Sequence, residues 1–88
     1  MEKCISVIIP TYNRRDKVLR AMDSVFNQTA IDAIGEIIII DDGSTDNTSE
    51  AVQKYKNAHK RIEIIYIEQK NAGASSARNR GMAIAKYD

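Results

Sequence analysis

A single cysteine and a lack of long apolar runs set the first limits on what this 88-residue chain can be. One cysteine excludes a disulfide within the chain and any metal site built from several thiolates, so Cys4 is expected to be a small apolar residue of a strand. No apolar run approaches the roughly 20 residues that a membrane-spanning helix needs. The first residues show no basic stretch leading into an apolar signal region. These features favour a cytoplasmic, reducing setting.

Neither sign of charge dominates the sequence. Thirteen Lys and Arg stand against twelve Asp and Glu, which leaves a net charge of +1, and the signs are interleaved. A nucleic-acid-binding domain usually shows a basic face, so no nucleic-acid partner is expected. The composition, 43% hydrophobic and 28% charged, is that of an ordinary soluble domain, and the length allows one small domain or part of a larger one.

Strand-like and helix-like segments alternate along the chain. Short β-branched runs at 4–9, 37–40 and 62–67 predict buried strands, and Pro10 is expected to end the first. Helical spacing predicts helices over 13–28, 47–56 and 74–86, with Asn13 and Asn47 as N-caps. This order predicts an α/β fold, a three-layer sandwich in which parallel β-strands alternate with helices.

The third predicted helix carries a ridge of small residues. Ala77, Gly81 and Ala85 follow one another at four-residue steps and would let the helix lie close to a sheet. This helix runs to the end of the printed sequence without a following strand, and three parallel strands leave two sheet edges that need cover. We interpret residues 1–88 as a single incomplete domain. The alternative is that a partner supplies the missing strands.

Three loops should meet where ligands bind in open parallel sheets, at the carboxyl ends of the strands. They span residues 10–14, 41–46 and 68–74, with Arg78 just beyond the third. Together they offer an aromatic ring, acids, hydroxyls and arginines, which suit a nucleotide. Taken singly, the same residues could be ordinary turns, a surface ring and a solvated charge.

Several familiar sites are missing from the sequence. It holds neither a phosphate-binding P-loop nor a dinucleotide-binding glycine motif. The acids at 41, 42 and 46 do not have the spacing of a calcium loop. His59 is expected to be an exposed loop residue, and Ser75 and Ser76 have no histidine base near them in sequence, so no nucleophile is assigned.

Three linked segments carry a family resemblance. SVIIPTYNR at 6–14, EIIIIDDGSTDNT at 36–48 and NAGASSARNRG at 71–81 together resemble the amino-terminal half of a family 2 glycosyltransferase. The resemblance covers essentially the whole chain. It implies a GT-A fold and transfer of a sugar from a nucleotide-diphosphate sugar, a UDP-sugar first of all, to an acceptor hydroxyl in polysaccharide or glycoconjugate synthesis.

The resemblance also implies roles for individual residues. Tyr12 would lie against the base, Asp42 would accept a hydrogen bond from it, and Asp41 would lie beside Asp42. Arg14 and Arg78 would lie near the base or the diphosphate. The full set of nucleotide-binding candidates is Pro10, Thr11, Tyr12, Arg14, Asp41, Asp42, Asn71, Gly73 and Arg78.

The sequence departs from the family pattern at its end. The Asp-x-Asp motif that holds a divalent cation, Mg or Mn, on the diphosphate is expected after Asp88, and the acid that deprotonates the acceptor further on. No catalytic residue and no metal ligand is therefore assigned here, and the 88-residue chain alone is expected to be inactive. The implied partners are a nucleotide-sugar donor and a carbohydrate or glycoconjugate acceptor. Association with the inner face of the membrane is expected through regions outside these residues, and the oligomeric state stays open.

Two readings from other classes compete with this one. A phosphoacceptor signalling module also ends an apolar strand in paired acids, but there the pair ends the first strand, whereas Asp41 and Asp42 end the second. A non-catalytic nucleotide-binding or interaction fragment would retain the half-site without the chemistry.

Overall fold

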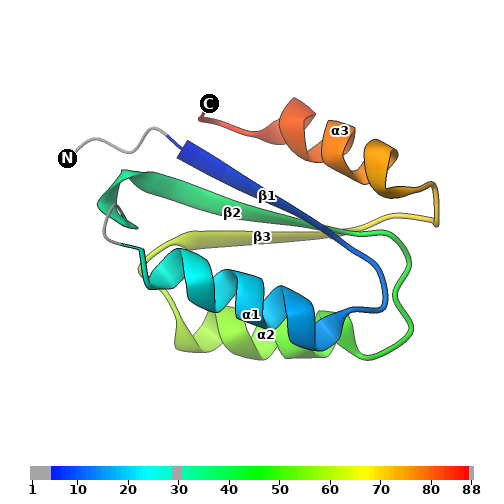
Figure 1. Cartoon of the computed structure of the whole chain (residues 1–88), viewed down its shortest axis with the longest axis horizontal. Helices are drawn as coiled ribbons and strands as arrows, with labels where there is room; N and C mark the ends of the chain where they lie inside the picture. Colours follow the sequence, from blue (N-terminus) through cyan, green and yellow to red (C-terminus); the bar gives the residue numbers. More distant parts are fainter. Residues whose placement is uncertain (1–4, 29–30, 88) are drawn as a thin grey trace.

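The computed structural model describes residues 5–28 and 31–87, which form one parallel sheet between two helical layers. The strands β1 (Ile5–Thr11), β2 (Ile34–Asp41) and β3 (Glu63–Glu68) pair in the order β1-β2-β3. Helices α1 (Arg15–Phe26) and α2 (Thr48–Ala58) cover one face, and α3 (Ala74–Ile84) covers the other (Figure 1). A 3-10 turn, η1 (Ile31–Ala33), leads into β2. The predicted three-layer α/β fold is confirmed.

The path of the chain gathers the carboxyl ends of the strands at one edge. From β1 to β3 the chain moves in one direction across the sheet, with α1 and α2 on the same face. It then crosses to the other face, where α3 packs on β1 and β2 (Figure 1). All three loops that follow a strand therefore lie at the same end of the molecule.

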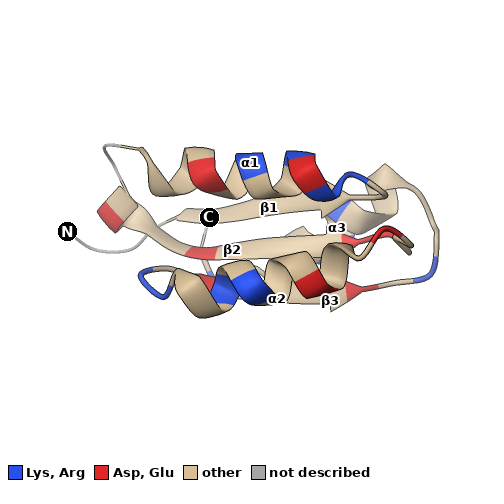
Figure 2. Cartoon of the chain, turned by 90° about the horizontal axis from the view of Figure 1, so that it is seen from below, with Lys and Arg blue, Asp and Glu red and all other residues tan. Residues whose placement is uncertain are grey.

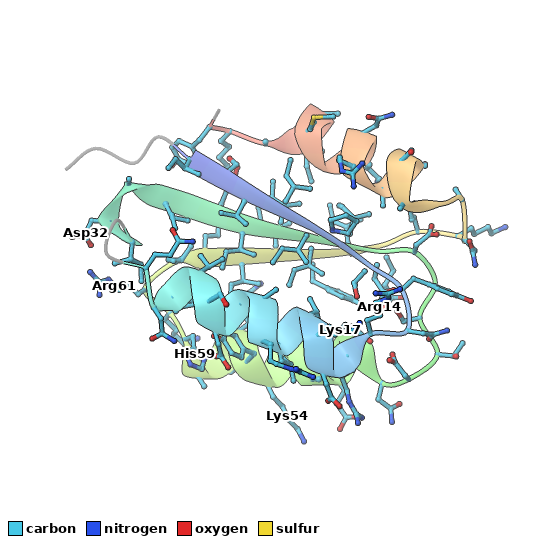
Figure 3. The ribbon with its side chains drawn as sticks, in the orientation of Figure 1. Arg14, Lys17, Asp32, Lys54, His59 and Arg61 are labelled. Atoms are coloured by element: carbon cyan, nitrogen blue, oxygen red, sulfur yellow. The ribbon has the colours of Figure 1, made fainter. Side chains whose placement is uncertain are left out.

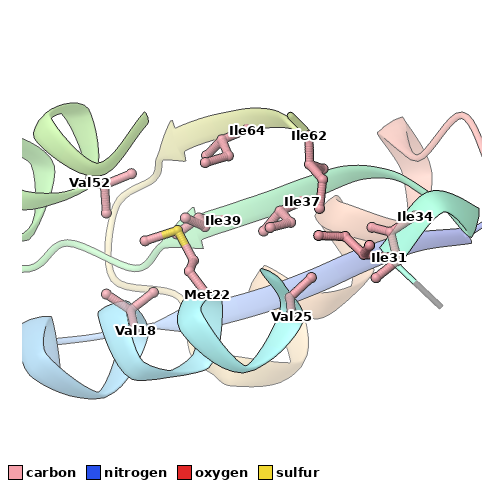
Figure 4. Packing of buried hydrophobic residues seen from close by; sticks show 10 residues of the cluster. All are labelled: Val18, Met22, Val25, Ile31, Ile34, Ile37, Ile39, Val52, Ile62 and Ile64. Carbon is pink, nitrogen blue, oxygen red and sulfur yellow. The ribbon is translucent and has the colours of Figure 1, made fainter. Parts of the chain in front are cut away.

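The isoleucine run of β2 forms the centre of both layers. Ile37 and Ile39 face α1 and α2, while Ile38 and Ile40 face α3, and all four are fully buried. Figure 4 shows Met22 of α1 directed toward Ile39. A strand that is apolar on both faces belongs in the middle of a sheet covered on both sides, as the sequence predicted.

The first strand continues through its proline. Pro10 pairs in register with Ile40, and the strand ends only at Thr11, so the prediction that Pro10 ends it was wrong. In the described sheet β1 has one neighbour, and a residue without an N–H is tolerated on such an edge strand. Cys4, predicted to belong to this strand, lies outside the described residues.

Of the two predicted asparagine caps, Asn47 does occupy the N-cap position of α2, whereas Arg14 and not Asn13 occupies that of α1. Asn13 and Asn47 both have positive φ, 48° and 63°, and in the described structure neither side chain caps a helix. Asp46 takes that role: its Oδ2 accepts the backbone N–H of Arg15 at 3.1 Å, and its Oδ1 accepts the hydroxyl of Thr48. One side chain therefore holds the starts of both α1 and α2.

The small-residue ridge of α3 packs as predicted. Ala77 and Gly81 are buried against the sheet, and Ala85, just after the helix, packs on the same cluster. A Cβ added to Gly81 would lie 2.5 Å from Cγ2 of Ile8, so only a glycine allows this approach.

A buried carboxylate at the far end of the sheet was not predicted. Glu36 is fully buried, and its Oε2 accepts the hydroxyl of Ser6 at 2.6 Å and the backbone N–H of Lys86 at 2.7 Å. Its Oε1 has no partner among the described residues. The ring of Tyr87 lies where a Cβ of Gly35 would be. These contacts hold the chain that leaves α3 against β1 and β2.

His59 is a packing residue, not the exposed loop residue that was predicted. Its ring stacks on Tyr55 at 3.9 Å between centroids and lies 5.3 Å from that of Phe26. This cluster ties the ends of α1 and α2 together, and an ion pair at 2.5 Å between Arg61 and Asp32 closes the same end of the molecule (Figure 3).

Both α1 and α2 carry charges of both signs (Figure 2), in keeping with the interleaved charges of the sequence. None of the described helices has the length and hydropathy to cross a membrane.

Candidate functional site

Backbone hydrogen bonds continue past the strand ends and join the three loops. The N–H of Asp42 donates to the carbonyl of Thr11 at 2.9 Å, and the N–H of Gln69 donates to the carbonyl of Asp41 at 2.8 Å. The loops after β1, β2 and β3 are therefore fixed relative to one another.

Asn13 provides a second connection between the first two loops. Its backbone N–H donates to Oγ of Ser44 at 2.8 Å, and its side-chain Oδ1 accepts the backbone N–H of Thr45 at 2.7 Å. The left-handed backbone of Asn13 suits these contacts, because asparagine tolerates positive φ better than most residues. The residue predicted to cap α1 instead bridges two loops.

Asp42 organises the loop between β3 and α3. Its Oδ1 accepts the side-chain amide of Gln69 at 2.8 Å and the backbone N–H of Ala72 at 2.7 Å, and its Oδ2 accepts the N–H of Gly73 at 2.9 Å. The hydrogen bond from Gln69, and then those from the backbone, lower the pKa of Asp42 below its ordinary value. The side chain is therefore a carboxylate at neutral pH.

Gly73 supplies the turn that brings its N–H to this carboxylate. Its φ is +96°, a region that residues with a Cβ rarely adopt. A Cβ added to Gly73 would have no described atom within 4 Å. Glycine is therefore required at this position by the backbone conformation, not by lack of space. The turn leaves an open space in front of the start of α3.

That space is part of a pocket of about 480 Å³ between the first and third loops. Eight of the nine nucleotide-binding candidates line it. They are Pro10, Thr11, Tyr12, Arg14, Asp42, Asn71, Gly73 and Arg78. The fold thus brings together side chains from three loops that are far apart in the sequence.

Sequence reasoning missed two lining residues, Ala74 and Ala77. Ala77 was assigned to packing alone, yet the first turn of α3 also forms a wall of the pocket. The small-residue pattern could have indicated that Ala77 both packs on the sheet and lines the pocket. A small side chain lets the helix approach the sheet and also leaves space for a ligand beside it.

The pocket combines a flat ring, one carboxylate and two guanidinium groups. The ring of Tyr12 is 45% exposed and offers a free face for stacking. Arg14 and Arg78 outweigh Asp42, which is the one acid among the described lining residues. This arrangement suits a ligand with an aromatic part that donates a hydrogen bond and an anionic part.

Asp41 was predicted to lie beside Asp42 in the site, but it points into the protein. Asp41 is 1% exposed and is not among the described residues that line the pocket. Its Oδ1 accepts the N–H of Ser44 at 2.8 Å, and its Oδ2 accepts the hydroxyl of Tyr66. Burial, and then the bond to Asp41, raise the pKa of Tyr66. Both oxygens of Asp41 therefore have donors inside the fold.

The acids of this edge do not fit a metal ion. In the ranges 5–28 and 31–87, no group of three or more His, Cys, Asp or Glu side chains is placed to hold one. Asp41 is buried and both of its oxygens accept internal hydrogen bonds, so it does not form with Asp42 a pair that is open to a metal ion. A phosphoacceptor site with a magnesium ion on paired acids is not supported for the same reason.

Known proteins resemble this chain over nearly its full length. It is 46% identical over 81 residues to the uncharacterized glycosyltransferase YibD of Escherichia coli, covering 92% of this chain and 22% of YibD. It is 39% identical over 82 residues to the chondroitin synthase of Pasteurella multocida, covering 93% of this chain and 8% of the synthase. The chain thus spans a small part of these relatives.

A solved structure extends the likeness to the fold. The mannosyltransferase PcManGT of Pyrobaculum calidifontis, in complex with GDP-Man and Mn²⁺, superposes with a TM-score of 0.87 at 26% identity, over 98% of this chain and 25% of PcManGT. This match supports the GT-A fold that the sequence implied. Residues 6–88 match the domain described as glycosyl transferase family 2. A match over nearly the whole chain, together with these relatives, shows that the chain belongs to glycosyl transferase family 2.

Proposed function

We propose that this chain is the nucleotide-binding part of a glycosyltransferase and that the pocket between the first and third loops holds the nucleoside diphosphate of a sugar donor. The observation that carries this proposal is the convergence of Tyr12, Asp42, Arg14 and Arg78 on one pocket. The GDP-Man complex of PcManGT supports a nucleotide sugar as the ligand class.

Each group has a distinct part in this proposal. Tyr12 stacks on the base, and Asp42 accepts an N–H from the base edge. The carboxylate of Asp42 accepts three hydrogen bonds from described residues. A carboxylate has about four acceptor positions, so one remains for the base. Arg14 and Arg78 supply the positive charge that a diphosphate needs.

A UDP-sugar is our first candidate for the donor. The N3–H of uracil is one donor that a single carboxylate can accept. Guanine also presents donors on its edge, and the related mannosyltransferase is described with GDP-Man, so GDP is the comparison that tests this choice.

We further propose that the acceptor is a hydroxyl of a polysaccharide or glycoconjugate, as the likeness to chondroitin synthase suggests. In such a transfer the bond from the sugar carbon to the diphosphate breaks, a bond to the acceptor oxygen forms, and the hydroxyl proton passes to a base. The residues described here bind and orient the donor, while the base and the ligands of the divalent cation lie in other parts of the protein. We also propose that the reaction takes place in the cytoplasm, at the inner face of the membrane.

Titration of UDP and GDP into the ¹⁵N-labelled chain tests the binding proposal. We expect saturable shifts at the amides of the pocket loops, with a dissociation constant of roughly millimolar order, because only stacking and a few polar contacts are made. Tyr12→Ala should weaken binding by about fivefold, since a stacking contact contributes on the order of 1 kcal/mol. The matched control is Ile84→Ala, which removes another exposed apolar side chain, 39% exposed, outside the pocket.

Two results would contradict the proposal: shifts that never saturate, or an equal loss in Tyr12→Ala and Ile84→Ala. Stronger binding of GDP than of UDP would retain the site and overturn the choice of uracil. We expect no sugar transfer from UDP- or GDP-sugars by the 88-residue chain with manganese and acceptor, and turnover above a protein-free control would show that catalytic groups lie within it.

A further inference from the structure

Next to the nucleotide pocket lies a second hollow, of about 420 Å³, at the start of α1. Its lining includes four cations, Arg14, Arg15, Lys17 and Arg20, and two acids, Asp16 and Asp46. Arg14 lines both this hollow and the nucleotide pocket, so the two are adjacent. We call the second hollow the basic hollow.

Both acids of the basic hollow contact the same residue, Arg15, but only Asp16 forms an ion pair with its guanidinium group. Oδ1 of Asp16 lies 3.6 Å from Nε of Arg15. Asp46 accepts the backbone N–H of Arg15 at 3.1 Å through Oδ2, and its carbonyl accepts Nη1 of Arg15 at 3.5 Å. Among the described residues, the side chains of Arg14, Lys17 and Arg20 form no ion pair and no side-chain hydrogen bond.

The charge of the basic hollow stands out from the rest of the chain. Four cations and two acids leave +2 in the hollow, whereas the whole chain has a net charge of +1. The remainder of the molecule is therefore slightly acidic. The cations are exposed, and Figure 3 shows Arg14 and Lys17 at the end of α1 nearest the loops.

The position of these cations opposes helix stability. A helix N-terminus carries partial positive charge, so cations there are unfavourable and cations in the last turn are favourable. In α1, Arg15, Lys17 and Arg20 lie in the first half, where Asp16 is the one acid of the first turn, and the last turn, as described, holds no basic residue. Lys17 and Arg20 are also three residues apart, near enough to repel each other. Asp16 and Asp46 offset these cations in part, and an anionic ligand would offset the rest.

We propose that the basic hollow is a phosphate-binding site, distinct from the nucleotide pocket and joined to it through Arg14. Arginine presents a planar pair of donors that matches two phosphate oxygens, and lysine adds a mobile third contact. A phosphate dianion would balance the charge of +2. The binding does not depend on the proposed function. If that function holds, the hollow brings a phosphorylated molecule or the phosphate of a lipid headgroup next to the donor.

Inorganic phosphate is the probe that tests this site. The ¹⁵N-labelled chain is titrated with sodium phosphate at constant ionic strength, and the shifts are followed at the amides around Lys17 and Arg20. Lys17→Gln together with Arg20→Gln should weaken phosphate binding by about tenfold, because two exposed charge contacts are removed. The control is Lys56→Gln with Lys60→Gln, two exposed cations at the other end of α2 from the hollow, which removes the same charge.

A second arm identifies the source of the phosphate. The chain is sedimented with vesicles of phosphatidylcholine alone and with added phosphatidylglycerol. Retention only on the anionic vesicles, lost in the Lys17, Arg20 variant and kept in the control, would support a lipid phosphate. Saturable binding of inorganic phosphate without retention would support a soluble one.

The proposal is overturned if neither probe binds, or if both double variants lose binding equally, since net charge alone would then be responsible. It is also overturned if phosphate shifts only the amides of the nucleotide pocket. Uridine, which has no phosphate, distinguishes failure of this proposal from failure of the proposed function. Uridine should bind through Tyr12 equally well to the Lys17, Arg20 variant and to the unaltered chain.

Discussion

The carboxylate of Asp42, the first residue after β2, accepts the backbone N–H of Gly73, 31 residues further along the chain, at 2.9 Å. The same carboxylate faces the pocket. Asp42 therefore has two parts: it shapes the loop that bounds the site, and it offers an oxygen to a ligand. Asp41, its neighbour in sequence, has only internal contacts. The two acids are separated because Asp41 is the last residue of β2 and points into the fold, whereas Asp42 is the first residue of the loop and lines the pocket.

Asp42→Asn is expected to reduce nucleotide binding by about tenfold or more. One carboxylate oxygen becomes an amide donor, which would face the N–H of either Ala72, Gly73 or the base. Titration of UDP into the labelled variant measures the loss, and the amide signal of Gly73 should shift even without nucleotide.

The hydrogen bonds from Gln69, Ala72 and Gly73 lower the pKa of Asp42. The stabilisation from these bonds is therefore complete at neutral pH and is lost as the pH falls below the ordinary pKa of 3.8.

Asp41→Asn is the comparison for this experiment. It should alter stability through Tyr66 and Ser44 while changing UDP affinity less than Asp42→Asn does. Circular dichroism and thermal unfolding confirm that both variants fold. Equal loss of affinity in the two would remove the distinction between the acids, and unchanged affinity in Asp42→Asn would remove base recognition by Asp42.

Gly81→Ala is expected to destabilise the fold by about 1–3 kcal/mol, the usual cost of overpacking a core. The new Cβ would meet Cγ2 of Ile8 at 2.5 Å and force α3 away from the sheet. Urea unfolding measures the change. The control is Asn79→Ala on the exposed side of α3, which should be neutral or slightly stabilising because alanine favours helices. A stable Gly81→Ala variant would show that α3 can move outward without loss.

The sequence was sufficient to predict the order of the elements and most of the pocket. The all-isoleucine β2, the alternation of strand and helix patterns, and the spacing of Ala77 and Gly81 each have one physical explanation, and all were confirmed. The pocket followed because parallel strands bring their carboxyl ends to one edge, so candidates on three loops had to meet.

The details that were missed are contacts between residues distant in sequence. Asn13 has the local pattern of a helix cap, but Thr45 competes for its side chain, and that competition appears only once the first two loops are adjacent. Asp46 capping α1 and His59 packing beside Phe26 have the same origin. The buried Glu36 was missed because a charged residue before an apolar run looks like a strand end.

The bridge between the first two loops gives a further prediction. Asn13→Gly retains the freedom for positive φ but loses the oxygen that accepts the N–H of Thr45. We expect a loss of about 1 kcal/mol in stability, the usual contribution of a hydrogen bond, and faster amide exchange at Thr45. Asn13→Asp keeps an acceptor at the same place and should behave like the unaltered chain. If the glycine variant exchanges no faster than the aspartate variant, the side chain does not hold the loops together.

Tyr66→Phe tests the buried contact with Asp41 through both stability and pH. At neutral pH the variant leaves a buried carboxylate oxygen without its donor, so the free energy of unfolding should fall by about 1–3 kcal/mol. Tyr55→Phe, which removes a more exposed hydrogen bond to Asp23, should lower the free energy of unfolding by less.

The pKa values of Tyr66 and Tyr55 give the pH test. Burial is the first cause that raises them above the ordinary 10.0, and the hydrogen bonds to Asp41 and Asp23 are the second. Folding therefore holds both protons more tightly, and the stabilisation is complete below pH 10.0 and is lost as the pH rises beyond it. Urea unfolding on either side of that pH should show a decline for the unaltered chain, a smaller one for each single variant, and the smallest for the double variant. A decline of equal slope in all four proteins would show that these hydroxyls do not cause the alkaline loss of stability.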